Sequence, residues 1–164
     1  MNIIEINEDE ITAALERLAS AMTNMMPVMQ DLGEFLATST RDRFTEGTGP
    51  DGTPWAPKSP ATLDAYARRR DPVDDRPLFG PTRRLSSEIH WFATPDSVEW
   101  GSSHIYAATQ QFGAAQGAFG ATSRGSPIPW GGIPARPFLG LSDSDRAEIA
   151  DIVAEWLEGI AAGG

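Results

Sequence analysis

Ser102, Ser103 and His104 place two hydroxyl groups beside an imidazole, the residue types of a hydrolytic site. A serine hydrolase also needs a carboxylate that orients the base and donors that hold the oxyanion. The Gly-x-Ser-x-Gly motif, which exposes a nucleophilic serine on a sharp turn, does not occur in the sequence. A small hydrolase using Ser103 and His104 is kept as an alternative, and the sequence predicts that the protein is not an enzyme.

The residue types do not favour a metal site or a cofactor site. The chain has no cysteine, and its two histidines, His90 and His104, are too few for a zinc site without carboxylate help. Asp51 lies in a glycine-rich loop that lacks the alternating oxygen ligands of a calcium site, so a plain turn is predicted. The glycines between 113 and 120 do not have dinucleotide-loop spacing. We expect no metal, no cofactor and no catalytic residue.

The charge argues against tight binding of nucleic acid. The 164 residues include 23 acidic and 13 basic side chains, a net charge of −10. The basic run Arg68–Arg70 is followed at once by acidic residues, which favours a solvated helix end over a phosphate-binding patch. The N-terminus is acidic where a signal peptide is basic, and no apolar run approaches the roughly 20 residues that cross a bilayer. We therefore expect a soluble, cytosolic protein with no membrane partner.

Helical periodicity dominates the first quarter of the chain. Apolar residues recur at steps of three and four from about residue 9 to 44, and Pro27 predicts a kink or a break with a second helix. This stripe contains Ile11, Leu15, Leu18, Met22, Met25, Met29, Leu32 and Leu36. Core filling explains its methionines better than a promiscuous binding groove does. A helix contact between subunits is a minority interpretation.

The rest of the chain predicts turns, short strands and a final helix. Pro50-Asp51-Gly52 favours a turn, with Trp55 holding the connector to the body, and Ser59 predicts a helix start that runs to about residue 70. Strands are expected over 85–93 and 98–101, joined by a turn at 94–97, and also over 105–109 and, at a sheet edge, over 135–141. Ser142 predicts the N-cap of the last helix. These elements indicate one α+β domain over 1–164: a small antiparallel sheet, a long kinked N-terminal helix, a C-terminal helix and a flexible loop over 113–133.

Four stretches occur in a recognisable order: Asp31–Phe44; Pro50–Pro57 with Ser59, Thr62 and Leu63; Ile105–Ala107 with Gln111–Gly113; and Ile133–Leu141. In this order they resemble the phage virion morphogenesis family, the tail-completion proteins of Mu-like contractile-tailed phages. The segment Leu78–Leu85 only approximates the leucine–threonine–glycine–leucine phrase that the family shows before its first strand. This departure blurs where the sheet begins.

The resemblance implies a structural protein that caps or completes the head-proximal end of a phage or prophage tail. It implies a homo-oligomeric, usually hexameric ring that contacts tail tube or sheath proteins and neck or connector proteins. It also implies assembly in the host cytoplasm and later residence in the virion. DNA would pass through such a ring without tight binding, and an acidic lumen would let it slide. The alternatives are a head–tail connector component and, from another class, an acidic DNA mimic.

A subunit or partner interface is the site that this function would need. The residues predicted for it are Tyr106, Gln111, Phe112, Phe119, Ile128, Trp130, Arg136 and Phe138. Tyr106 and Phe112 fit a core role equally well, and Gly113 favours a backbone conformation that other residues avoid. The carboxylate partner of Arg136 could lie in a neighbour or in the first turn of the last helix of the same subunit.

Overall fold

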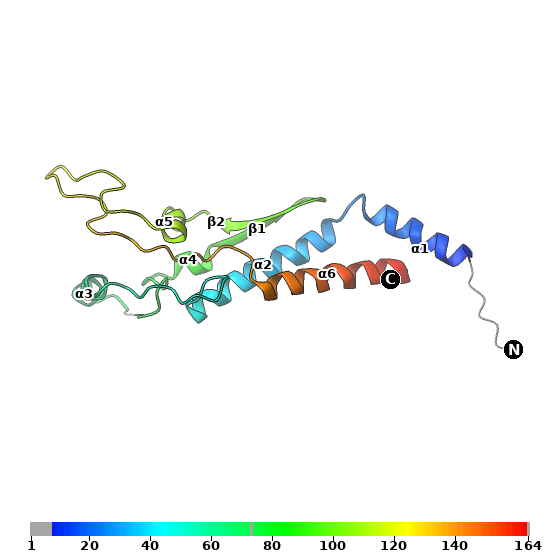
Figure 1. The fold of residues 1–164 in the computed structure, drawn as a ribbon, viewed down its shortest axis with the longest axis horizontal. Helices are drawn as coiled ribbons and strands as arrows, with labels where there is room; N and C mark the ends of the chain where they lie inside the picture. Colours follow the sequence, from blue (N-terminus) through cyan, green and yellow to red (C-terminus); the bar gives the residue numbers. More distant parts are fainter. Residues whose placement is uncertain (1–7, 73, 164) are drawn as a thin grey trace.

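The computed structural model describes residues 8–72 and 74–163, and it shows an elongated molecule (Figure 1). Helix α1 spans Glu8–Ala21 and α2 spans Met26–Glu46. Pro27 lies in the first turn of α2, where a missing amide hydrogen costs no intrahelical bond. The backbone N–H of Met25 donates to the Pro95 carbonyl at 3.0 Å. The predicted break with a second helix is confirmed.

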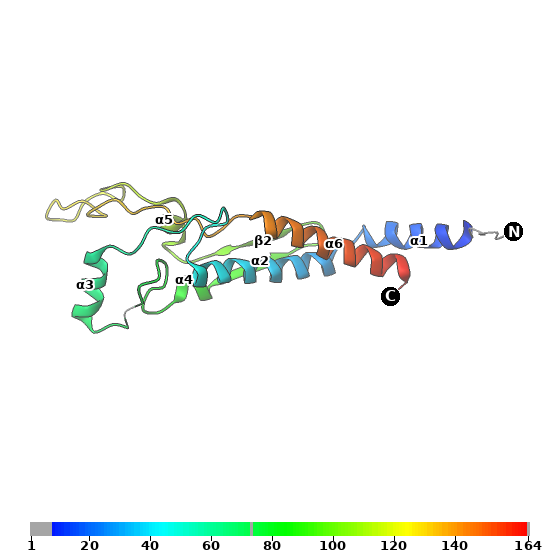
Figure 2. The same ribbon diagram turned by 60° about the horizontal axis from the view of Figure 1, so that its bottom comes forward.

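The apolar stripe predicted for the N-terminal helix divides at this break. Leu32 and Leu36 are buried in α2, which lies in the middle of the molecule. Ile11, Leu15 and Met22 are exposed, because α1 extends beyond the end of α2 and contacts α6 (Figure 2). A single continuous buried face is therefore not formed.

The sheet consists of one antiparallel hairpin. Strand β1 spans Ile89–Ala93 and β2 spans Val98–Ser102, with Trp91 opposite Trp100. The predicted turn is confirmed, because the Thr94 N–H donates to the Ser97 carbonyl at 2.8 Å. The hairpin packs on α2 at Gly33, where a Cβ atom would come within 2.5 Å of the Trp91 ring. Glycine is required there by the close approach of the two elements.

Two of the predicted strands, 105–109 and 135–141, were wrong, and the strand predicted over 85–93 begins only at residue 89. Residues 85–88 fall in and just after a helical turn, α4 (Arg84–Ser87), and 105–109 run into helix α5 (Ala107–Phe112). Alternation over four or five residues does not distinguish a strand from a helical turn with one buried side chain, and Leu85 is such a side chain. Residues 135–141 form no strand in the described chain, and Pro134 and Pro137 offer no ladder donors there.

The core gathers where the C-terminal end of α2 meets three loops. Phe44 is fully buried, and its ring contacts those of Trp55, Phe79 and Phe138 at centroid distances of 5.5, 6.3 and 5.3 Å. The Trp55 indole N–H donates to the Pro137 carbonyl at 2.9 Å. Trp55 thus holds the 47–57 connector to the body, as predicted.

Both predicted helix caps are present. The Ser59 hydroxyl accepts the Thr62 N–H at the start of α3 (Pro60–Arg69). Ser142 begins α6 (Asp143–Ala162) with a capping box that it shares with Asp145. The fold is α+β, as predicted, with a two-stranded antiparallel sheet between helices that come from both ends of the chain.

Candidate docking groove and loop

A long excursion between α5 and α6 projects from one end of the molecule (Figure 1). Its two arms are joined by backbone hydrogen bonds: Ala114 and Ile133 exchange a pair, and the Phe119 N–H donates to the Ile128 carbonyl at 2.8 Å. We call residues 113–133 the excursion loop. Three of its predicted interface residues are exposed: Phe119 by 57%, Ile128 by 38% and Trp130 by 78%.

Gln111 fixes the base of the excursion loop to the core. Its side-chain oxygen accepts the N–H groups of Phe138 and Leu139, each at 3.0 Å, and its amide nitrogen donates to the Leu139 carbonyl at 3.0 Å. One side chain therefore satisfies backbone groups that a neighbouring strand would otherwise have satisfied. This explains how 135–141 is held in place without being part of the sheet.

Arg136 and Phe138 lie inside the subunit. The Arg136 guanidinium donates to the carbonyls of Ala56 and Pro57 and to the side chain of Gln110. Burial lowers the pKa of Arg136. Its partners are carbonyl and amide oxygens of the same chain, where a carboxylate had been predicted. Phe138 is fully buried in the core. Both residues can support a docking surface from within.

The aromatic residues around α5 are exposed. Tyr106 stacks against His104 at a ring-centroid distance of 4.0 Å, and Phe112 is 78% exposed. His104 Nδ1 is buried and has no hydrogen-bond partner in the described part of the chain. In the described residues, this nitrogen therefore has no carboxylate contact of the kind that orients a catalytic base.

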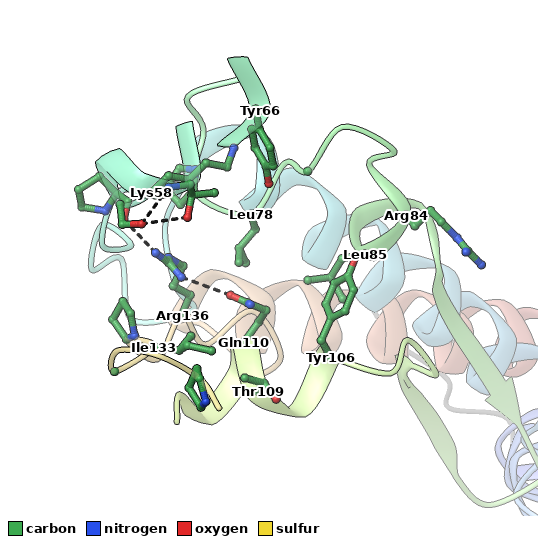
Figure 3. Close-up of a pocket in the computed structure, with 18 of the residues that line it drawn as sticks. Lys58, Tyr66, Leu78, Arg84, Leu85, Tyr106, Thr109, Gln110, Ile133 and Arg136 are labelled. Atoms are coloured by element: carbon green, nitrogen blue, oxygen red, sulfur yellow. Dashed lines mark hydrogen bonds between the residues drawn. The ribbon is translucent and has the colours of Figure 1, made fainter. Parts of the chain in front are cut away.

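A cavity of about 720 Å³ lies between α3, α4, α5 and the base of the excursion loop (Figure 3). We call it the α3 groove. Tyr66 reaches into it from α3, and Tyr106 from the start of α5. Its further lining includes Leu78, Leu85, Phe119, Ile128, Ile133 and Arg136. Apolar and aromatic side chains with a few polar groups are typical of a recognition site.

Lys58 builds one wall of the α3 groove. No role for this residue was predicted from the sequence. Its ammonium group donates to the carbonyls of Asp74, Arg76 and Phe79 and so closes the loop between α3 and α4. Burial lowers the pKa of Lys58, while the carboxylates of Asp74 and Asp75 oppose that shift. Beside it, a hydrogen bond from the Arg76 side chain lowers the pKa of Asp74 to about 2.

The described residues contain no group of three or more His, Cys, Asp or Glu side chains that could hold a metal ion. The carboxylate of Asp51, in the 47–57 connector, instead accepts hydrogen bonds from the backbone N–H and the hydroxyl of Thr53.

No helix in ranges 8–72 and 74–163 is both long and apolar enough to span a bilayer.

Comparison with known protein families and proteins identifies the family of this chain. Residues 6–158 match the Phage virion morphogenesis family. The chain belongs to this family. It is 30% identical over 156 residues to Mu-like prophage FluMu G protein 2 of Haemophilus influenzae, covering 94% of this chain and 95% of that protein. It is 28% identical over 163 residues to Tail completion protein S of Escherichia phage P2, covering 96% of this chain and 99% of that protein. No solved structure gives a significant match.

The four stretches that carried the resemblance meet in space in this family member. Arg43, in the first stretch, donates to the carbonyls of Phe138 and Gly140 in the fourth. Trp55, in the second, donates to Pro137, and Gln111, in the third, binds Phe138 and Leu139. The Ile133–Leu141 segment is therefore the common partner of the other three.

Gln111→Ala should lower the free energy of unfolding by about 1–3 kcal/mol, because it leaves two N–H groups and one carbonyl without partners. Urea denaturation followed by circular dichroism measures the change. Gln116→Ala is the matched control, since the Gln116 side chain makes an exposed hydrogen bond to Trp130 within the excursion loop. Equal effects of the two substitutions would contradict the anchoring role of Gln111.

Proposed function

We propose that this protein is a non-catalytic structural subunit that completes the head-proximal end of a phage or prophage tail and helps to join tail to head. The observation that carries the proposal is the match to a relative named Tail completion protein S, which extends over 99% of that protein. The similarity therefore extends over nearly the whole length of both chains. The family assignment supports the same class of function.

The proposed contact with the tail is the excursion loop. Phe119, Ile128 and Trp130 expose apolar area at the end of the molecule farthest from α1. Large aromatic side chains that become buried on binding are frequent hot spots of protein interfaces. The hydrogen bonds between the two arms limit the ordering entropy that docking costs. The proposed partners are tail tube or sheath proteins on one side and neck or connector proteins on the other.

Ring formation is the second part of the proposal. A cyclic homo-oligomer, such as a hexamer, needs two different patches on each subunit that meet head to tail. The net charge of −10 would then disfavour DNA retention if acidic side chains face the lumen. Assembly would take place in the host cytoplasm, with the completed ring remaining in the virion.

Co-sedimentation with tail tubes and, separately, with portal–adaptor complexes tests this function. Both partners are taken from the same phage or prophage. We expect the protein to bind tube ends, and Phe119→Ala with Trp130→Ala to weaken that binding at least tenfold. Ser123→Ala, in the same loop, is the control. Binding to portal–adaptor complexes alone would favour a head–tail connector, and binding to neither would overturn the proposal.

A further inference from the structure

Helix α1 leaves its largest apolar side chains in solvent. Ile11 and Leu15 are 48% and 60% exposed, and Met22, one residue past the end of α1, is 58% exposed. The Met22 N–H donates to the Leu18 carbonyl at 3.0 Å, so the helical turn continues to Met22 and the three side chains share one face. Another face of α1 rests on α6, where Arg17 donates to the carbonyls of Ile160 and Ala161. In the described part of the chain, about half of the surface of Ile11, Leu15 and Met22 therefore stays in contact with solvent.

The α3 groove has the chemistry that an amphipathic helix needs. Its floor is apolar, with Leu78, Leu85 and Ile133, and its openings carry the aromatic rings of Tyr66 and Tyr106. An amphipathic helix binds such a groove by inserting side chains spaced at three, four and seven residues. Ile11 and Leu15 are four residues apart, and Leu15 and Met22 are seven apart.

The charges of the two regions are opposite. Residues 58–84 contain seven basic side chains and four carboxylates, a net charge of +3, whereas the rest of the chain carries −13. Residues 8–21, which form α1, contain four carboxylates and one arginine, a net charge of −3. Arg84 lines the groove, and Arg69 lies 5.4 Å from the ring centroid of Tyr66, which also lines it. Their side chains are 62% and 57% exposed, and each forms an ion pair with a carboxylate of its own subunit, Glu88 and Asp71 respectively.

The two regions also lie at opposite ends of the molecule. Helix α1 forms one end in both views, whereas α3 and the excursion loop form the other (Figures 1 and 2). A contact between them is therefore most readily made between two copies. Such a contact joins different patches, so it repeats from copy to copy and produces a ring if the rotation closes.

We propose that the apolar stripe of α1 in one copy docks in the α3 groove of the next copy. This inference rests on the proposed ring, and it names the two surfaces that build it. The acidic flanks of α1 would face Arg69 and Arg84 on the groove rim. Phe119 and Ile128, which line the groove, would be covered by the neighbour's helix, whereas Trp130, which is not part of the lining, would remain available to the tail.

Disulfide cross-linking tests the contact without background, because the chain contains no cysteine. Ile11, Leu15 and Met22 are changed to cysteine one at a time, and each variant is mixed with Ile128→Cys. At least one pair should form a covalent dimer in more than half of the chains under mild oxidation. Ser20→Cys, exposed on the opposite face of α1, should remain below a tenth of that yield. The mixture should stop at dimers, and a chain carrying both cysteines should give longer oligomers.

The reaction is run with concentrated protein and again with protein bound to tail-tube ends. Charge reversal by Arg69→Glu with Arg84→Glu should lower the yield at least fivefold, whereas Arg146→Glu on α6 should leave it unchanged. Absence of the mixed dimer in both settings overturns the inference. So does dimerisation of Leu15→Cys alone, or an intramolecular cross-link in the double variant. If cross-linking fails while tube binding persists, the inference is wrong and the tail-completion function stands; if both fail, both are overturned.

Discussion

Asp145→Ala should lower the free energy of unfolding by about 3–5 kcal/mol, the largest effect expected for a single substitution in this protein. Asp145 and Arg43 form a buried ion pair and are 4% and 6% exposed. Removing the carboxylate leaves the Arg43 guanidinium charged in the interior. It also removes the acceptor for Ser39 and for the Ser142 hydroxyl and N–H. Urea denaturation measures the loss.

Asp143→Ala is the matched control, because Asp143 lies in the same first turn of α6 but is exposed. It should cost at most about 1 kcal/mol, the usual value of a carboxylate at a helix N-terminus. Arg43→Met combined with Asp145→Leu should recover part of the stability, since neither charge is then left unpaired. Equal losses for the Asp143 and Asp145 variants would contradict the role assigned to the buried pair.

The Arg43–Asp145 ion pair should also make the free energy of unfolding depend on pH. Burial by itself would raise the pKa of Asp145, but hydrogen bonds from Ser142 and Ser39 and the charge of Arg43 together lower it. A lowered folded-state pKa gives stability that is complete above the unfolded-state value of about 3.9 and is lost as the pH falls through the folded value. Denaturation between pH 7 and pH 2 should therefore show a steeper loss below pH 4 for the natural chain than for Asp145→Ala.

Local signals in the sequence predicted the features that local chemistry determines. Ser59 and Ser142 cap helices because their hydroxyls reach N–H groups three residues ahead. Pro27 starts a helix and the 94–97 segment turns, both for reasons confined to a few residues. The α+β class followed from these elements, and the structure bears it out.

The two wrong strands, 105–109 and 135–141, have different physical causes. In 105–109 the backbone makes local helical bonds, with the Tyr106 carbonyl accepting the Gln110 N–H and the Thr109 carbonyl the Gly113 N–H. In 135–141 the backbone finds partners distant in sequence: the Gln111 side chain for Phe138 and Leu139, and the Gln110 carbonyl for Arg136. A side chain that replaces a strand leaves no periodic signal in the sequence.

Only part of the candidate site could be predicted from the sequence, because some of its residues are defined by partners that are distant in sequence. Phe119, Ile128 and Trp130 stand out in a loop of small residues, and the structure leaves them exposed; their role in binding stays a prediction. Lys58 and Asp145 gave no such signal, because a buried charge is recognised only from its partners in space. The single lysine of the chain, next to a helix cap, was the one hint that could have drawn attention to position 58.

Gly113→Ala should lower the free energy of unfolding by about 2–4 kcal/mol and displace the excursion loop. Gly113 ends α5 with φ of 74° and ψ of −179°, a conformation that favours glycine. A Cβ atom there would lie 2.7 Å from the Ile133 carbonyl oxygen and 2.8 Å from the Ala135 nitrogen. Both contacts are with backbone, so neither can be relieved by rotating a side chain.

The matched control for this substitution is Gly131→Ala, in the same loop, where an added Cβ meets nothing within 4 Å. It should change stability by less than about 0.5 kcal/mol. Thermal unfolding and tail-tube binding are measured for both variants. If the base of the loop sets the position of Phe119 and Trp130, tube binding should weaken in Gly113→Ala even at temperatures where the variant is fully folded. Full binding by a folded Gly113→Ala variant would show that the loop tip docks independently of the backbone that joins it to the core.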